Sequence, residues 1–304
     1  MEIFMKEILI TGGTTFVSKY ATEYFLKNNY KVYVLNRNTK KQVDGAILIE
    51  ANRHELNDKL KNFHFDAVVD VTAYNAADII DLTNSLGSFD QYIMISSSAV
   101  YPDNEIQPFK EDSKLGFNKF WGDYGINKIE AENALRLRVP DAYILRPPYL
   151  YGPLNNIYRE AFVFDCAEDG RIFYLPDNGN MKLQFLHVRD LCYIIEKIIE
   201  TKPAEHILNV GNEEAVSVKD WVTLCYKCFQ KTPSFAYVDK NIEQRNYFCF
   251  YNYEYYLDVQ KQKQILPNTI PLAEGLQDAA DRYSESNSEI SKKDYIKYID
   301  YNLT

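Results

Sequence analysis

The sequence predicts an α/β protein in which helices cover both faces of a doubly wound parallel sheet, with a smaller C-terminal α/β lobe. Short apolar segments alternate with helix-like segments through the first half of the 304 residues, and the turn Thr11-Gly12-Gly13 directly follows the first apolar segment. The alternation loosens after Pro153. Apolar strands that alternate with helices are typical of a parallel sheet buried on both faces. Right-handed crossovers then place ligands at the carboxyl ends of the strands.

The expected elements follow one another along the first half. Apolar side chains at helical spacing predict a helix at residues 16–28, and further helices are expected at 54–63, 76–86 and 124–138. The expected strands are residues 6–11, 31–35, 46–49, 67–71, 92–95 and 142–145.

The second half has a less regular pattern. Residues 184–201 are expected to be a strand edge that leads into a helix, and residues 237–253 a polar-aromatic loop. The tail at 288–304 is interpreted as a last surface helix, with disorder as the alternative. The remaining expected elements are extended segments at 171–175 and 207–210 and helices at 158–169, 217–230, 258–265 and 272–284.

Composition excludes several classes of function. The formal net charge is −9, and no basic block is longer than Lys40-Lys41 or Lys292-Lys293, which argues against nucleic acid or a membrane as partner. Five cysteines, an odd number without a secretory leader, favour a reduced, cytoplasmic location. Cys225 and Cys228 form an isolated Cys-x-x-Cys pair, so no metal site is expected.

A candidate acid–base group lies at the start of the helix expected at 124–138. Tyr124 and Lys128 are four residues apart and therefore share a helix face. A lysine ammonium beside a phenol lowers the pKa of the phenol, and a serine hydroxyl from Ser96-Ser97-Ser98 can hold a substrate oxygen. The alternative is an exposed helix face on which the pair has no role.

The turn at Gly12 and Gly13 is a candidate phosphate site. A glycine turn from a first strand into a helix is where a dinucleotide pyrophosphate meets free backbone N–H groups. The alternative is a plain strand-to-helix turn.

Several motifs follow one another along the chain: Thr11-Gly12-Gly13, Ser97, Tyr124 with Lys128, Leu145-Arg146-Pro147-Pro148, Tyr151-Gly152-Pro153, and Phe185-Leu186-His187-Val188-Arg189-Asp190-Leu191. Taken together, they resemble those of the extended short-chain dehydrogenase/reductases, the NAD-dependent epimerase/dehydratase family, including its atypical members. The resemblance implies a Rossmann-type NAD(P)-binding domain at residues 1–157, to which 184–207 returns, and a mainly substrate-binding lobe at 158–304.

The resemblance also implies roles for individual residues. Tyr124 would exchange the hydroxyl proton, Lys128 would lower its pKa and hold the nicotinamide ribose, and Ser97 would orient the substrate oxygen. Ser98 is the alternative to Ser97 and, with Tyr149, would bind substrate. The expected cofactor-binding residues are Gly12, Thr14, Thr15, Phe16, Val17, Arg37, Asn52, Arg53, Ala73, Tyr74, Tyr124, Lys128 and Pro147.

Several positions depart from the family pattern. Thr15 and Ser18 stand where the second and third glycines are usual, which places cofactor affinity in question. Arg37 follows the second strand in place of an acid and favours NADP over NAD, the alternative being a solvated loop residue. Ser98-Ala99 replaces the Asp-Glu pair of sugar 4,6-dehydratases, and Tyr149 replaces an Asn that is frequent in nucleotide-sugar binders.

The resemblance therefore predicts an NADP- or NAD-dependent epimerase or reductase acting on a sugar, with a nucleotide-linked sugar as the leading substrate class. The rival is a non-catalytic member that senses dinucleotide or binds RNA. A homodimer through the helices at 76–86 and 124–138 is usual in the family, and some atypical members are monomers.

Overall fold

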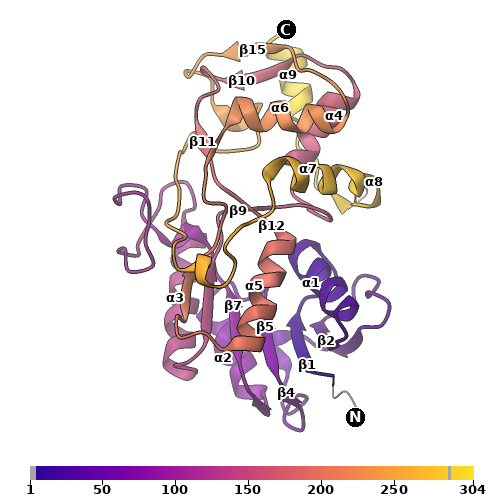
Figure 1. Cartoon of the computed structure of the whole chain (residues 1–304), viewed down its shortest axis with the longest axis vertical. Helices are drawn as coiled ribbons and strands as arrows, with labels where there is room; N and C mark the ends of the chain where they lie inside the picture. Colours follow the sequence, from indigo (N-terminus) through magenta and orange to yellow (C-terminus); the bar gives the residue numbers. More distant parts are fainter. Residues whose placement is uncertain (1–4, 287–288) are drawn as a thin grey trace.

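The computed structural model describes residues 5–286 and 289–304, and within them a seven-stranded parallel sheet forms the lower half of Figure 1. The strand order is β13-β8-β7-β5-β1-β2-β3. Every pairing between neighbours is parallel, so the predicted α/β class with a Rossmann-like sheet is confirmed. The strands are β1 (Glu7–Thr11), β2 (Lys31–Asn36), β3 (Ile47–Glu50), β5 (Ala67–Asp70), β7 (Tyr92–Ile95), β8 (Tyr143–Arg146) and β13 (Ile207–Asn209).

Helices cover both faces of this sheet (Figure 1). On one face, α1 (Phe16–Lys27) and α5 (Val188–Thr201) pack on the side chains of Ile8 and Ile10. On the other face, α2 (Ala76–Ser85) and α3 (Asp123–Arg138) pack on Leu9. The alternation of Ile8, Leu9 and Ile10 between the two cores follows from the two-residue period of a strand.

The strand order reverses at β1, because β2 lies on one side of β1 and β5 on the other. In an open α/β sheet this reversal creates a crevice at the carboxyl ends of the strands. The glycine turn follows β1, and Ser96 to Ser98 follow β7, so both open onto that edge.

The second lobe lies above the sheet in Figure 1. Its core is aromatic, with Phe162, Phe173, Trp221 and Phe250 all buried. Its elements are α4 (Glu160–Glu168), β10 (Phe173–Pro176), α6 (Val218–Cys228), β15 (Phe235–Val238), α7 (Leu272–Asp281), α8 (Tyr283–Ser286) and α9 (Tyr295–Asn302). Other short strands pair outside the seven-stranded sheet: β9 (Tyr149–Tyr151) with β12 (Phe185–His187), β11 (Lys182–Leu183) with β14 (Val216–Ser217), and β4 (His64–Phe65) with β6 (Ser88–Phe89).

Two expected helices are wrong. The helix expected at 54–63 is the 3₁₀ turn η1 (Arg53–Glu55), and Asn57 at φ +48° ends any helical path. The helix expected at 258–265 is the 3₁₀ turn η4 (Gln262–Gln264). There the buried Gln262 amide bonds both the N–H and the carbonyl of Gly211, which fixes the segment to β13 instead of letting it wind into a helix.

The C-terminal region partly follows the prediction. The helix expected at 272–284 is divided into α7 and α8 at Arg282. The expected tail helix is α9, which is shorter than residues 288–304, and residue 288 lies outside the described residues. In the described part of the chain, no helix is both long and apolar enough to cross a membrane.

Candidate active site

Tyr124 is brought to the sheet edge by a close contact between α3 and the turn η2 (Ser98–Val100), which follows β7. Gly125 lies directly against Ala99, and a Cβ atom at Gly125 would overlap the Ala99 carbonyl. Glycine therefore allows α3 to approach the turn that carries Ser97. As a result, Ser97 and Tyr124 line the same cavity.

Two opposing effects act on the Tyr124 phenol. Desolvation raises its pKa above the ordinary value, and hydrogen bonding with Ser97 and the positive charge of Arg159 act in the opposite direction. The Ser97 hydroxyl also accepts a hydrogen bond from the Ala99 N–H at 3.1 Å, which fixes its position at the start of η2. Tyr124 as a residue is 40% exposed, and it lines the cavity.

Lys128 lies one helical turn after Tyr124 and is buried. Its ammonium donates hydrogen bonds to the carbonyls of Ala73 at 2.7 Å and Ile95 at 2.9 Å. Burial lowers the pKa of Lys128 to about 8. The ammonium lies 5.9 Å from the ring centre of Tyr124 and 5.1 Å from that of Tyr74. The ammonium bonds carbonyl oxygens and not the phenol, and its expected lowering of the Tyr124 pKa stays a prediction.

The glycine turn has the backbone that a phosphate loop requires. Gly12 and Gly13 adopt φ values of +94° and +91°, which favour glycine. A Cβ at Gly12 would lie 2.8 Å from the Ser18 hydroxyl, and one at Gly13 would lie 2.6 Å from Val34. Neither position accepts a larger residue without rearrangement.

Thr15 and Ser18, which stand where the family pattern has glycine, fit into the turn without an unsatisfied buried polar group. The Ser18 hydroxyl donates to the Thr15 carbonyl at 2.9 Å, so Ser18 is buried with its polar atom satisfied. Thr15 precedes α1 and makes no side-chain capping bond to it. The first N–H groups of α1 therefore remain available to an anion. Thr15, Phe16 and Val17 line the cavity, whereas Thr14 lies in the turn outside the lining.

The end of β2 carries an amide where family members that use NAD carry an acid. The Asn36 amide donates to the carbonyl of Gly12 at 2.6 Å and to the side chain of Gln42 at 2.9 Å. Arg37 is exposed and forms no ion pair with any described residue. Lys40 donates to the Thr15 hydroxyl at 3.2 Å. Lys40 also forms an ion pair with Glu289 at 3.5 Å, so the carboxylate beside the turn comes from Glu289 and not from β2.

Arg53, expected near the cofactor, forms a buried ion pair instead. Its guanidinium donates to both carboxylate oxygens of Asp70, at 2.7 and 2.6 Å. Asp70 also accepts hydrogen bonds from the Tyr92 hydroxyl at 2.5 Å and the Thr11 hydroxyl at 2.8 Å. Burial alone would raise the pKa of Asp70, but the Arg53 guanidinium holds it below its ordinary value. Asp70, at the end of β5, therefore connects Arg53 to Thr11 of β1 and Tyr92 of β7.

Two other expected cofactor residues also make contacts within the chain. The Asn52 side chain accepts a hydrogen bond from the His54 N–H at 3.2 Å and caps η1. Ala73 is buried and contributes its carbonyl to Lys128. Tyr74 is 54% exposed, and its ring centre lies 6.5 Å from that of Tyr124.

A cavity of about 670 Å³ joins the glycine turn to the second lobe. It brings together ten of the expected site residues, whereas Gly12, Thr14, Arg37, Asn52, Arg53 and Ala73 are not among its lining residues. The expected residues that line it are Thr15, Phe16, Val17, Tyr74, Ser97, Ser98, Tyr124, Lys128, Pro147 and Tyr149.

The expected substrate residues differ in their contacts. The Ser98 hydroxyl donates to the Tyr255 hydroxyl at 3.1 Å, and the Ser98 N–H donates to the Pro147 carbonyl at 2.9 Å. The Tyr149 hydroxyl is buried and has no hydrogen-bond partner among the described residues. Sequence reasoning missed Trp121 and Arg159 in the lining. Tyr251 and Tyr255 belong to the aromatic run at 247–256, which the sequence offered equally as a pocket lining or as the packing surface of the small lobe.

The remaining candidates contribute to packing. The buried His187 ring accepts the Arg189 N–H at 3.2 Å, and burial lowers the pKa of His187 to about 3, so the ring is neutral. Cys225 and Cys228 are unpaired thiols of α6, and burial raises the pKa of each. Across the described residues, no three His, Cys, Asp or Glu side chains are grouped to hold a metal ion.

The chain is similar to known proteins in both sequence and structure. The family model described as the NAD dependent epimerase/dehydratase family matches residues 8–211. The chain belongs to this family. A crystal structure of UDP-glucuronic acid 4-epimerase from Bacillus cereus with UDP-glucuronic acid and NAD is 17% identical, with a TM-score of 0.74, and covers 92% of this chain and 99% of that one. At this identity the likeness shows the fold, which is that of the family.

Two further relatives show how widely family members differ. The chloroplast stem-loop binding protein of 41 kDa b of Arabidopsis thaliana is 26% identical over 300 residues, 90% of this chain and 78% of that protein. The decarboxylating sterol-4-alpha-carboxylate 3-dehydrogenase of Dictyostelium discoideum is 23% identical over 253 residues, 73% of this chain and 76% of that protein. Membership in the family therefore does not assign an activity.

Proposed function

We propose that this family member is an NAD(P)-dependent epimerase or reductase that acts at a carbinol carbon of a sugar. The observation that carries the proposal is the convergence of Ser97, Tyr124 and Lys128 on the cavity that also borders the start of α1. A positioned phenol, a hydroxyl and a cation beside a phosphate-binding helix end are the groups that such chemistry needs.

The residues present fit a dinucleotide. The uncapped start of α1 and the close backbone at Gly12 and Gly13 suit a pyrophosphate, and Lys128 lies where a ribose hydroxyl would meet its ammonium. When bound, the nicotinamide supplies or accepts the hydride. The Ser97 hydroxyl would hold the substrate oxygen, and Tyr124 would donate a proton to that oxygen or remove one from it.

The choice between NADP and NAD rests on the end of β2. Asn36 carries no charge to repel a 2′-phosphate, and Arg37 is free to bind one through its planar guanidinium. These features support NADP. Solved structures of family members contain NAD, which keeps NAD as the alternative.

A nucleotide-linked sugar is the substrate class suggested by relatives. UDP-glucose 4-epimerase from Thermotoga maritima, solved with UDP-glucose, is 18% identical with a TM-score of 0.73 and covers 92% of this chain and 99% of that one. Loss of water from the sugar is disfavoured, because Ser98-Ala99 provides no Asp-Glu pair and the Ser98 hydroxyl bonds Tyr255.

Replacing the phenol tests the proposal. Tyr124→Phe should lower turnover about a thousandfold, because general acid–base catalysis contributes about 10²–10⁴ in rate. Calorimetry should show dinucleotide affinity within about twofold of the wild type. Tyr301→Phe, on the exposed end of α9, is the matched control and should leave both quantities unchanged. Normal turnover by Tyr124→Phe would refute the mechanism.

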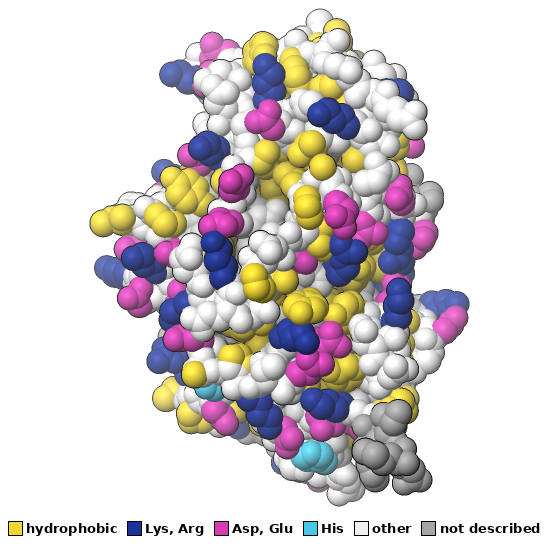
Figure 2. Space-filling model, viewed as in Figure 1, with side chains coloured by type: hydrophobic (Ala, Val, Ile, Leu, Met, Phe, Trp, Pro, Cys, Tyr) yellow, Lys and Arg dark blue, Asp and Glu magenta, His cyan; other side chains and the backbone are white. Residues whose placement is uncertain are grey.

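Binding of an RNA stem-loop is a second candidate, favoured by the name of the Arabidopsis relative. The net charge of −9 opposes it, and Figure 2 shows Lys and Arg interspersed with Asp and Glu without a continuous basic stripe on the visible face. Titration of a labelled stem-loop RNA at two salt concentrations tests this candidate. Tight, salt-dependent binding by both the wild type and Tyr124→Phe would establish RNA binding in this protein.

We propose a homodimer through α2 and α3 as a third feature shared with the family. Ile80 on α2 is 38% exposed and Leu137 on α3 is 85% exposed, so both helices present apolar side chains to solvent. Sedimentation of the wild type and of Leu137→Glu tests the dimer. A monomeric wild type would refute it.

A further inference from the structure

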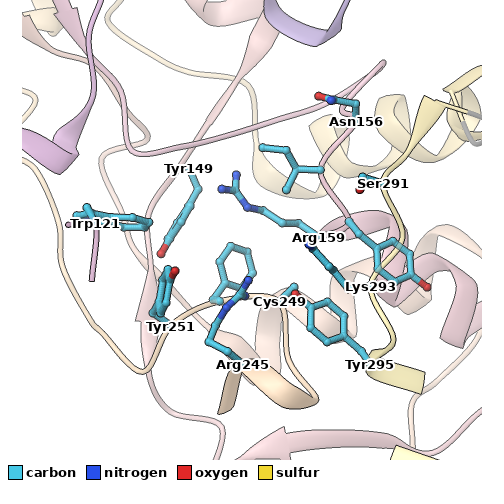
Figure 3. Close-up of a pocket in the computed structure, with 13 residues that line it drawn as sticks. Trp121, Tyr149, Asn156, Arg159, Arg245, Cys249, Tyr251, Ser291, Lys293 and Tyr295 are labelled. Carbon is cyan, nitrogen blue, oxygen red and sulfur yellow. The ribbon is translucent and has the colours of Figure 1, made fainter. Parts of the chain in front are cut away.

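A second, smaller chamber opens beside the main cavity. Its volume is about 300 Å³, and it shares six lining residues with the main cavity: Trp121, Tyr149, Asn156, Ile157, Arg159 and Tyr251. Figure 3 shows side chains from separate segments of the chain converging on it, with Arg159 and Arg245 extending inward. Its lining residues are Trp121, Tyr149, Asn156, Ile157, Tyr158, Arg159, Arg245, Cys249, Phe250, Tyr251, Ser291, Lys293 and Tyr295.

The charge of this chamber is unbalanced. Its lining includes Arg159, Arg245 and Lys293 and no acidic side chain. None of these three cations forms an ion pair with another described residue. Glu160, the next residue after Arg159, instead accepts hydrogen bonds from the side chain of Asn155 at 2.9 Å and from the N–H of Gly152 at 3.3 Å. Three cations that line one chamber without an acidic side chain favour an anionic ligand.

Aromatic rings hold the two guanidiniums in place. Arg159 lies 4.9 Å from the ring centre of Tyr149 and 5.8 Å from that of Phe250. Arg245 lies 4.8 Å from the ring centre of Tyr251 and also donates to the Phe248 carbonyl at 3.2 Å. Stacked guanidiniums retain their N–H groups for a ligand, because stacking uses the face of the group and not its donors.

The chamber is also lined by Tyr149, whose buried hydroxyl is unpaired within the described chain. Tyr149 is only 4% exposed, and its hydroxyl has no hydrogen-bond partner within the described chain. Tyr149 lines both the chamber and the main cavity. A buried hydroxyl without a partner is costly unless a ligand or water satisfies it.

We propose that this chamber is an anion subsite that binds the phosphate monoester of a compact sugar phosphate, with the sugar reaching into the main cavity toward Tyr124. The inference rests on the proposed function and narrows its substrate class. Arg159 connects the two spaces, because it lines both of them. A phosphate held by Arg159 and Arg245 would fix the distance between the charged end of the substrate and the reacting carbinol.

Size and stacking favour a monoester over a nucleotide at this subsite. A volume of about 300 Å³ is at the lower end of ligand pockets, which suits a phosphate with a few sugar atoms and not a nucleoside as well. The guanidiniums cover the rings of Tyr149 and Tyr251, on which a base would otherwise stack. A sugar phosphate satisfies the cations without displacing these contacts.

Calorimetry on the full chain tests the subsite without cofactor or turnover. The probes are inorganic phosphate, glucose 6-phosphate, glucose 1-phosphate, glucose, UMP and UDP-glucose. Inorganic phosphate and at least one hexose phosphate should bind the wild type, and each of Arg159→Gln and Arg245→Gln should weaken this binding at least fivefold. Arg136→Gln, which removes the same charge from the exposed end of α3, should leave it unchanged.

The outcomes separate this inference from the proposed function. Phosphate binding that is absent, or equal in the wild type and both arginine variants, would overturn the subsite whatever Tyr124 does. UDP-glucose binding at least tenfold tighter than either hexose phosphate, with arginine-dependent binding of UMP, would overturn the monoester and assign the chamber to a nucleotide. Arginine-dependent phosphate binding would support the subsite even if Tyr124→Phe retained full turnover.

Discussion

Arginines occupy two contrasting environments in this protein. Beneath the groove, Arg53 is paired with Asp70, and Arg146 donates to the buried carboxylate of Glu132 at 3.0 and 2.6 Å. In the chamber, by contrast, Arg159 lies against aromatic rings and faces no carboxylate. The comparison shows how the contacts of an arginine indicate its role. An arginine paired with a buried carboxylate supports the fold, whereas an arginine that contacts only aromatic rings keeps its N–H groups available to a ligand.

Breaking a paired arginine should have the largest effect on stability. Arg53→Gln leaves the Asp70 carboxylate buried without its partner, so the free energy of unfolding should fall by about 3–5 kcal/mol. Urea denaturation measures this loss. Adding Asp70→Asn to Arg53→Gln should recover part of it, because the unpaired charge is then removed.

Arg159→Gln is the counterpart that completes the comparison. It removes a stacking contact of about 0.5–1 kcal/mol and relieves repulsion from Arg245, so its unfolding free energy should stay within about 1 kcal/mol of the wild type. A loss as large as that of Arg53→Gln would show that Arg159 is structural and would remove the contrast between the two environments.

Lys128 extends the comparison to a buried cation with no carboxylate partner. Its pKa is about 8 in the folded protein, against 10.5 as its ordinary value. Between these values the unfolded chain binds more protons, so the stability of the wild type relative to Lys128→Met should rise with pH. The change between pH 7 and pH 10.5 should be about 3 kcal/mol. Urea denaturation of both proteins across this range measures it, and a constant difference would contradict a lowered pKa.

The next prediction concerns Arg37, which is exposed and forms no ion pair with any described residue, as expected of a ligand-binding arginine. Arg37→Gln should weaken NADPH binding about tenfold, equivalent to about 1.4 kcal/mol, and leave NADH binding unchanged. Isothermal titration of both dinucleotides measures the two affinities. Equal affinities of the variant and the wild type for NADPH would show that Arg37 does not bind the 2′-phosphate.

Local spacing explains which parts of the site could be predicted from sequence. Tyr124 and Lys128 share a helix face by their separation alone, and Gly12 is recognisable because it directly follows the first strand. The sheet could be predicted for the same reason, because its strands are short, apolar and separated by helices.

Contacts between distant segments explain what could not be predicted. The ion pair of Arg53 could not be predicted, because the sequence does not show that Asp70 lies within reach of its guanidinium. The chamber combines Arg159, Arg245 and Lys293 from three separate segments, none of which carries a motif. The 3₁₀ turn η4 depends on two buried hydrogen bonds between Gln262 and Gly211, which helix propensity does not include.

Binding of a nicotinamide dinucleotide beside Gly12 and Thr15 underlies the roles proposed for Ser97, Tyr124 and Lys128. Calorimetric titration of the nucleotide-free protein with NADPH and NADH tests this binding most directly. We predict saturable binding of at least one dinucleotide, with NADPH bound more tightly than NADH. If neither dinucleotide bound, the side chains of Thr15 and Ser18 would have closed the groove, and the proposed enzyme activity would be contradicted.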